Sequence, residues 1–176
     1  AWGLYGSDAQ TAANVQKYLT VLGWIKTAIP KATDGYYGKP PTPGYSATQV
    51  SETSKRYTDW QARNDRIVAI GNAVEATFPS LYPVNPNREG WVKWAVGTIK
   101  EARRIAPGKK VYPFINPRYH GSACCGLAWD LVPNDFFLLQ LKTLRQHADG
   151  VVIWDGSRRP WDENEPWWQA MLEFRR

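Results

Sequence analysis

Four short apolar and β-prone stretches recur along the chain, and each ends at an aromatic residue, a proline or a polar residue. They are residues 1–6 (AWGLYG), 76–83 (ATFPSLYP), 110–117 (KVYPFINP) and 150–156 (GVVIWDG). The segments between them carry apolar residues at helical spacing. Because strands that alternate with helices favour a parallel sheet with crossover helices, the pattern predicts an α/β fold with about four parallel strands and flanking helices.

The last of these stretches gives the clearest signal. Val151, Val152 and Ile153 form a continuous β-branched run, as expected for a strand that is buried on both faces. Trp154 and Asp155 follow directly. Ligands bind at the carboxyl ends of strands in barrels and doubly wound sheets, so this pair is a candidate for a ligand site.

The helical segments have recognisable start and stop signals. Ser7 to Gln10 resembles a capping box and opens a helix that we expect to end near Gly23. A second helical pattern covers residues 47–71, and a third begins at residue 87 and stops at residues 107–108. Two further helices are expected to begin at residue 133 and at about residues 162–165. Residues 29–46 are rich in Gly, Pro, Thr and Tyr and predict a long loop. Its tyrosines favour a packed loop over a disordered linker.

Composition is that of one globular domain with a substantial core. The 176 residues are 43% hydrophobic and 14% aromatic, with ten Trp and nine Tyr. This aromatic excess suits a carbohydrate-binding cleft, because sugar faces stack on aromatic rings. The alternative is that Trp and Tyr fill the core.

The formal charge of +6 favours anionic partners such as nucleic acid, membrane or an acidic polysaccharide. The basic residues form no run, and solvated helix ends explain most of them. No nucleic-acid-binding motif is present, which disfavours that class. No apolar run is long enough to span a membrane. The chain starts at Ala1 without Met or a signal peptide, so we expect a processed or cut piece.

The two cysteines are adjacent, at Cys124 and Cys125. A vicinal pair rarely bonds to itself, and a bond to a cysteine of another chain stays open. With no Cys-x-x-Cys and two isolated histidines, the sequence predicts no zinc site, and no other metal or cofactor.

Several short motifs, in order along the chain, resemble the hyaluronidase family of glycoside hydrolases. Trp2-Gly3-Leu4-Tyr5 is similar to the family's Trp-Gly-Tyr-Tyr on the fifth barrel strand. The later matches are Asn64-Asp65-Arg66-Ile67, Pro79-Ser80-Leu81-Tyr82, Glu101-Ala102-Arg103-Arg104, Val111-Tyr112-Pro113-Phe114 through Tyr119, and Gly150 to Gly156. A related barrel glycosidase would give similar strands.

The resemblance implies that residues 1–176 form a single domain, the carboxyl-terminal half of a (β/α)8-like barrel with strands five to eight. It implies an extracellular or cell-surface location. In the family, residues equivalent to Tyr5, Tyr82 and Trp154 line the sugar site. The chain departs from the family at Leu4 and Asp155, and it lacks the family's cysteine framework.

The family's proton donor is a Glu in an Asp-x-Glu motif, which this chain lacks. Asp155 and Tyr82 are the candidates for catalytic roles. The alternative for Asp155 is a strand-end cap or an ion pair with Arg158 or Arg159. The acidic run at residues 162–165 reads as a helix cap.

Other residues near strand ends are candidate sugar ligands or structural groups. Asn116, Arg118 and Tyr119 follow the third strand and are candidates to bind hydroxyl or carboxylate groups, and Arg118 suits an anionic sugar in a bidentate geometry. Glu75 precedes its strand and is expected to be structural.

Four parallel strands alone would leave two open edges and an uncovered face. The chain therefore needs a partner: the amino-terminal half, a second copy, or a flattened sheet within an α/β sandwich. We favour the docked half-barrel. The leading hypothesis is a glycoside hydrolase-like domain that holds an amino-sugar or acidic polysaccharide and is inactive alone, with its acid on the missing half. The alternative is a non-catalytic carbohydrate-binding or structural subunit of a surface assembly.

Overall fold

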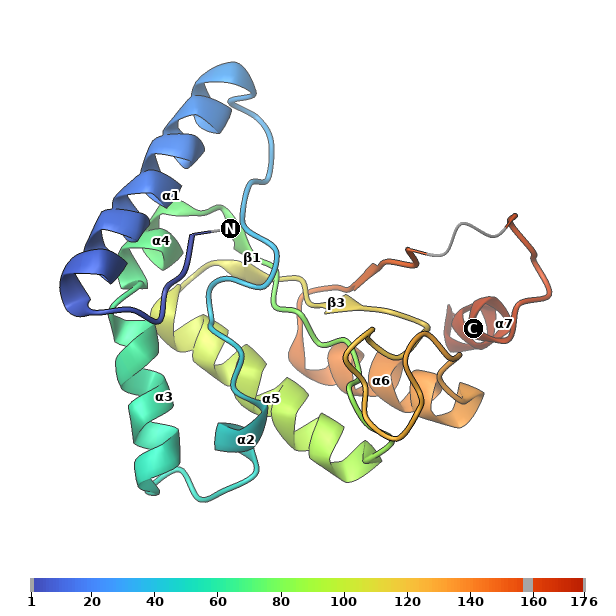
Figure 1. Cartoon of the computed structure of the whole chain (residues 1–176). Coiled ribbons are helices and arrows are strands. Elements are labelled where there is room, and N and C mark those ends of the chain that lie inside the picture. The colour runs from blue at the N-terminus through green and yellow to red at the C-terminus, as the bar shows by residue number, and fades with distance from the viewer. Residues whose placement is uncertain (1, 157–159, 176) are drawn as a thin grey trace.

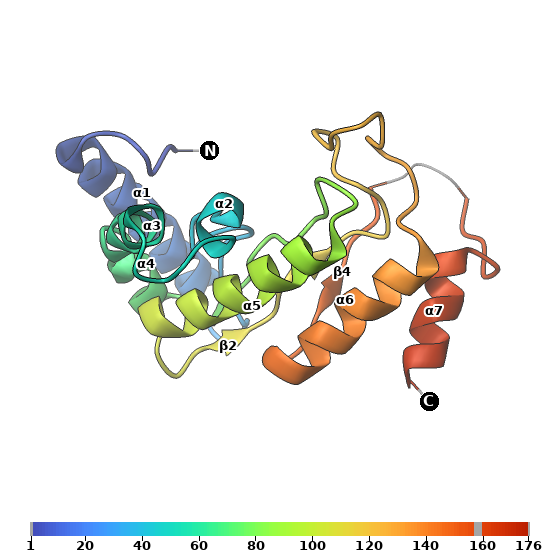
Figure 2. The same cartoon turned by 90° about the horizontal axis from the view of Figure 1, so that it is seen from below.

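The computed structural model describes residues 2–156 and 160–175 and has helices packed around short parallel strands (Figure 1). The elements in chain order are α1 (Asp8–Ala28), α2 (Tyr45–Thr48), α3 (Lys55–Asp65), α4 (Val68–Ala73), β1 (Ala76–Thr77), α5 (Arg88–Ile105), β2 (Lys110–Val111), β3 (Phe114–Ile115), α6 (Asn134–His147), β4 (Val152–Ile153) and α7 (Pro166–Arg175). The helices α5, α6 and α7 follow one another along the molecule, while α1, α3 and α4 gather at the other end (Figures 1 and 2). Within the described residues, no helix is both long and apolar enough to cross a membrane.

The strands are shorter than the sequence pattern suggests, but they are parallel, as predicted. β1 pairs with β2, with Ala76 opposite Lys110, and β3 pairs with β4, with Phe114 opposite Val152. A parallel bridge between Ser80 and Phe114 joins the two ladders. The segments around β1, β2–β3 and β4 therefore lie next to one another in chain order, as crossover helices require.

A fourth parallel segment comes from the loop before α2. Tyr37 forms a parallel bridge with Phe78, and the Gly38 N–H donates to the Phe78 carbonyl at 2.7 Å. Gly35 permits this approach, because a Cβ there would lie 2.3 Å from the Ala76 carbonyl oxygen. The prediction that this loop is packed is confirmed.

The prediction of a strand in the first apolar stretch is wrong. The chain before α1 forms no strand over its described residues, and Leu4 is buried against α1 and α4. Side chains of α1 hold the segment: Asn14 Nδ2 donates to the Gly3 carbonyl at 2.7 Å, and the Tyr18 hydroxyl donates to the Trp2 carbonyl at 3.0 Å. The stretch is apolar because it covers a helix, and its backbone groups are taken by side chains.

Helix starts follow the sequence more closely than helix ends. Ser7 caps α1 by accepting the Gln10 N–H, as predicted, and Asn87 caps α5 in the same way. The expected end of α1 at Gly23 is wrong, because the helix continues to Ala28. A glycine inside a helix costs only about 1 kcal/mol relative to alanine, and the surrounding turns tolerate it here.

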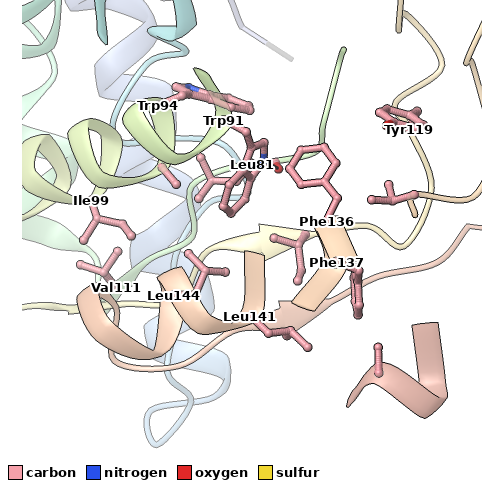
Figure 3. Packing of buried hydrophobic residues seen from close by; sticks show 14 of the residues in the cluster. Leu81, Trp91, Trp94, Ile99, Val111, Tyr119, Phe136, Phe137, Leu141 and Leu144 are labelled. Carbon is pink, nitrogen blue, oxygen red and sulfur yellow. Dashed lines mark hydrogen bonds between the residues drawn. The ribbon is translucent and has the colours of Figure 1, made fainter. Parts of the chain in front are cut away.

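The main core lies between the strands and helices α5, α6 and α7 (Figure 3). Trp91 and Phe136 meet edge to face with ring centroids 6.2 Å apart, and Trp91 Nε1 donates to the Leu81 carbonyl at 2.9 Å. Phe137 and Leu141 of α6 complete the centre of this cluster. The strands thus bury one face against the helices.

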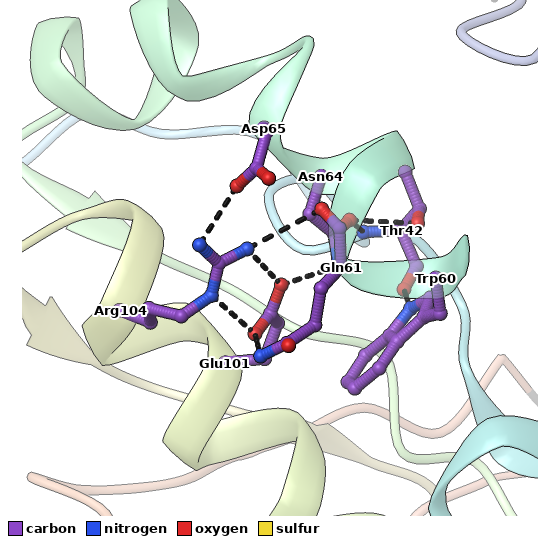
Figure 4. Close-up of polar contacts among 7 residues, drawn as sticks. All are labelled: Thr42, Trp60, Gln61, Asn64, Asp65, Glu101 and Arg104. Atoms are coloured by element: carbon purple, nitrogen blue, oxygen red, sulfur yellow. Dashed lines mark hydrogen bonds and ion pairs between the residues drawn. The ribbon is translucent and has the colours of Figure 1, made fainter. Parts of the chain in front are cut away.

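A buried polar network joins α3 to α5 at the other end (Figure 4). The Glu101 side chain is 1% exposed and accepts Asn64 Nδ2 at 2.8 Å and two bonds from Arg104, each at 2.8 Å. Asn64 Oδ1 in turn accepts the backbone N–H and the hydroxyl of Thr42. Arg104 also pairs with Asp65 at 2.7 Å. The motif that contains Asn64 and the motif that contains Glu101 therefore contact each other and hold α3 against α5.

Candidate functional site

Alternate residues along the strands face away from the helical core and are only partly buried. Successive side chains of a strand point to opposite faces, so each strand gives one set to the core and one to the other face. The core side carries Leu81, Val111 and Ile115. The half-buried residues of the second face, which we call the open face, are Phe78, Ser80, Tyr82, Tyr112, Phe114 and Val152.

A row of aromatic rings covers the open face. Phe78 lies 6.0 Å from Tyr112 and 6.2 Å from Phe114, measured between ring centroids. Tyr37 extends the row, at 5.0 Å from Phe114 and 5.8 Å from Tyr82. The rings therefore run without a break from Phe78 and Tyr112 at the amino end of the strands to Tyr82 at the carboxyl end.

Tyr82 provides a neutral hydroxyl at the carboxyl end of the row. Burial raises the pKa of its phenol well above the ordinary range, and the nearby Tyr37 adds to the effect. The Tyr37 hydroxyl is 2.8 Å from Ser80 Oγ, so polar groups gather here. A phenol that stays protonated can donate a hydrogen bond to a bound sugar but is a poor base.

Trp154 is an exposed aromatic residue that directly follows β4. The register places Val152 and Trp154 on the same face as Phe114, and the Trp154 side chain is mostly open, at 56% exposure. The backbone N–H of Trp154 donates to the Ile115 carbonyl at 3.0 Å, which fixes the backbone at this residue. An exposed ring on a fixed backbone is suited to stack on a ligand.

Asp155 turns to Arg118, which is 6% exposed. Arg118 Nε lies 3.5 Å from Asp155 Oδ1, and Nη2 lies 3.6 Å from Glu165 Oε1. Nη1 donates to the Trp129 carbonyl at 3.4 Å. One guanidinium thus connects the end of β4, the start of α7 and the loop between β3 and α6.

Arg118 lies within ion-pair distance of Asp155, and the predicted alternative of an ion pair with Arg158 or Arg159 stays a prediction. The partners expected from the sequence, Arg158 and Arg159, lie outside the described residues. Glu165 belongs to the acidic run before α7, where Asp162 Oδ1 accepts the Asn164 N–H at 2.8 Å in a turn that precedes the helix.

Asn116 and Tyr119 are buried and support the backbone after β3. Asn116 Oδ1 accepts the Arg118 N–H at 2.8 Å. The Tyr119 ring lies in the main core, and its N–H donates to the Asp130 carbonyl at 2.9 Å. Their burial favours a supporting role, and direct sugar contact by Asn116, Arg118 and Tyr119 stays a prediction.

The site residues predicted from the sequence include Tyr5, at an expected strand end, but not Tyr37, whose ring packs beside the open face. Tyr5 is exposed but precedes α1 in a segment that is not a strand. The Gly-Tyr-Tyr of the fifth-strand motif also occurs at residues 35–37, where the structure has the parallel bridge. The signal was therefore in the sequence, hidden in a stretch rich in glycine and proline.

No three His, Cys, Asp or Glu side chains of residues 2–156 and 160–175 converge in a way that would hold a metal ion. Glu75, expected to be structural, forms an exposed ion pair with Lys26 at 2.7 Å.

Comparison with known proteins identifies the fold. No family model and no curated protein sequence matches the chain. Bee venom hyaluronidase has a similar structure, with a TM-score of 0.67 and 22% identity over 92% of this chain and 50% of that one. Bee venom hyaluronidase in complex with a hyaluronic acid tetramer gives a TM-score of 0.62 and 22% identity over 89% and 47%. The chain thus has a hyaluronidase-like fold and spans about half the length of these structures.

Proposed function

We propose that the chain is the carboxyl-terminal half of a (β/α)8-like glycoside hydrolase barrel and that it holds an amino-sugar or acidic polysaccharide. The observation that carries the proposal is the set of Tyr37, Tyr82 and Trp154, which share the open face at the carboxyl ends of parallel strands. Barrel enzymes place their sites at this end. The similar fold of a hyaluronidase that binds a hyaluronic acid tetramer supports the substrate class.

The rings at the amino end of the open face support the missing half. Phe78, Tyr112 and Phe114 are only half-buried. Side chains at such positions fill the interior of a closed eight-stranded barrel, so an amino-terminal half would cover them. The match to about half of bee venom hyaluronidase agrees with this reading. A second copy of the chain is the other candidate for this place, and the expected location is extracellular or at the cell surface.

Within the proposed site, Trp154 stacks on a sugar ring and Tyr82 donates a hydrogen bond from its neutral phenol. Tyr37 takes the place first assigned to Tyr5. Arg118 holds Asp155 and with it the backbone of Trp154, so it acts as a positioning residue. Glycoside hydrolysis needs a carboxylic acid that protonates the leaving oxygen. We place that acid on the amino-terminal half.

A second candidate function is that of a non-catalytic carbohydrate-binding subunit of a surface assembly. The contact between Asp155 and Arg118 favours it, because a carboxylate paired with a buried guanidinium is suited to a structural role. The aromatic open face serves both functions equally.

The test is to express the chain alone and joined to its upstream half, and to assay both on hyaluronan and chitin-like oligomers. We expect the joined protein to bind and cleave, and the chain alone to do neither or to bind weakly. Binding without turnover by the joined protein selects the second function. No binding to either glycan by the joined protein contradicts both.

A further inference from the structure

The loop between β3 and α6 carries the two cysteines and is anchored at its base and beside Tyr82. At the base, the Val132 N–H donates to the Pro117 carbonyl at 2.8 Å. Near the tip, the His120 N–H donates to the Pro83 carbonyl and the Cys124 N–H donates to the Val84 carbonyl, both at 2.9 Å. The loop is therefore held to the segment that directly follows Tyr82.

Cys124 and Cys125 present their thiols to each other and to solvent. Both side chains are exposed, and the two Sγ atoms are 2.7 Å apart. Adjacent side chains in an extended chain point to opposite sides. Here Cys125 has a φ of +64°, in the left-handed region that residues other than glycine rarely adopt, and this turn brings the thiols together.

We propose that Cys124 and Cys125 form a redox-active dithiol that small disulfides such as oxidised glutathione convert reversibly into an internal disulfide. The thiolate of one cysteine attacks the small disulfide and releases one thiol, and the second cysteine then displaces the other thiol. In total, the two protein thiols lose two hydrogen atoms and form one S–S bond, while one small disulfide is reduced to two thiols. This chemistry does not depend on the proposed glycan binding.

Geometry makes such a bond reversible. Neighbouring Cα atoms are about 3.8 Å apart across a trans peptide, below the usual disulfide span of about 4.4–6.8 Å. The bond therefore strains the backbone and is readily reduced, as regulatory disulfides are. In the reduced pair, the contact with Cys125 raises the pKa of the Cys124 thiol because it stabilises the protonated form. The exchange is therefore expected to speed up at alkaline pH.

The strain falls on the peptide that links the two cysteines. Its carbonyl, that of Cys124, accepts the Leu127 N–H at 3.2 Å and closes the turn at the loop tip. Ring closure twists this peptide and weakens that bond, whereas the bond of Val132 at the base is remote from it. Oxidation is thus expected to loosen the tip of the loop beside Tyr82 and to leave its base unchanged.

The test equilibrates the whole chain at pH 8 in glutathione buffers of graded reduced-to-oxidised ratio, followed by alkylation and mass spectrometry. We expect two alkylated thiols in reducing buffer and none in oxidising buffer, with loss of two hydrogen atoms and full reversal on reduction. The variants Cys124→Ser and Cys125→Ser should show only glutathione adducts. Two free thiols at all ratios, stable adducts on both cysteines, or only interchain dimers would overturn the proposal.

Hydrogen exchange supplies the structural readout. The Leu127 amide should exchange about tenfold faster in the oxidised chain, as expected for a weakened hydrogen bond. The Val132 amide is the internal control and should keep its rate. If oxidation leaves the Leu127 rate unchanged, the twist of the linking peptide is refuted. If both amides accelerate equally, oxidation unfolds the whole loop and the localised device is also refuted.

Discussion

Replacement of Glu101 by alanine is expected to destabilise the fold through the network in Figure 4. The loss leaves Asn64 Nδ2 without its acceptor in a fully buried residue, which costs about 1–3 kcal/mol. Arg104 contributes less, because its side chain is 38% exposed and keeps Asp65 as a partner. Because water and Asp65 still solvate and pair with Arg104, the loss of its contacts with Glu101 costs at most about 1 kcal/mol. The free energy of unfolding should therefore fall by about 1–4 kcal/mol.

The assay is urea unfolding followed by tryptophan fluorescence and circular dichroism. Glu101→Gln separates hydrogen bonding from charge: it keeps an acceptor for Asn64 and should cost about 1 kcal/mol. The matched control is Glu89→Ala on the same helix, where Glu89 pairs with Lys93 at 2.7 Å but is 79% exposed. It should leave the free energy of unfolding nearly unchanged, because solvent screens this exposed pair. An equal, small effect of Glu101→Ala and Glu89→Ala would refute the reasoning.

Three further changes test other parts of the structure. Gly35→Ala should lower the free energy of unfolding by about 1–3 kcal/mol in thermal melts, because the new Cβ meets the Ala76 carbonyl oxygen at 2.3 Å; an unchanged melting temperature would show that the segments do not pair. Burial raises the pKa of Asp149, but the Val111 N–H and nearby cations outweigh burial, so the pKa is lowered overall. The stability that Asp149 contributes is therefore present at neutral pH and is lost as pH falls below about 4. Asp149→Asn should lower the stability at pH 7 and weaken its dependence on acid pH, and a pH profile identical to that of the unaltered protein would contradict this. Tyr82→Phe should keep the fold and weaken glycan binding about fivefold to tenfold in calorimetry, the loss of one hydrogen bond, and full affinity would remove the phenol from the site.

The sequence predicted the elements whose signals are local. Ser7 and Asn87 announce helix starts by their side-chain chemistry, and the β-branched run before Trp154 announces a parallel strand. These features depend on neighbours in the chain, so a single sequence contains them. The parallel order of the strands follows from the same alternation of elements.

The misassigned strand shows where local signals fail. The stretch around Leu4 and the segment around Tyr37 both carry glycine and tyrosine, and only the second lies beside β1. The choice depends on Asn14 and Tyr18 of α1, which take the backbone carbonyls of the first stretch. Those contacts are tertiary, and no period in the sequence predicts them.

The candidate site was predicted in part for the same reason. Tyr82 and Trp154 end apolar runs, and the register puts Trp154 on the open face. The Arg118 contacts with Asp155 and Glu165 link residues far apart in the chain, so their spacing gives no warning. The sequence therefore predicted residue types at strand ends but not which of them hold the others in place.

The most direct test of the proposed function is a calorimetric titration of hyaluronan oligomers into the chain joined to its upstream half, with two tryptophan variants. Trp154→Ala removes the exposed ring of the open face, whereas Trp24→Ala removes a ring of α1 that is 67% exposed and serves as the control. We predict that Trp154→Ala weakens binding about thirtyfold, the usual cost of about 2 kcal/mol for a central aromatic contact, and that Trp24→Ala has no effect. Equal affinity of both variants and the unaltered protein would contradict a sugar site on this face.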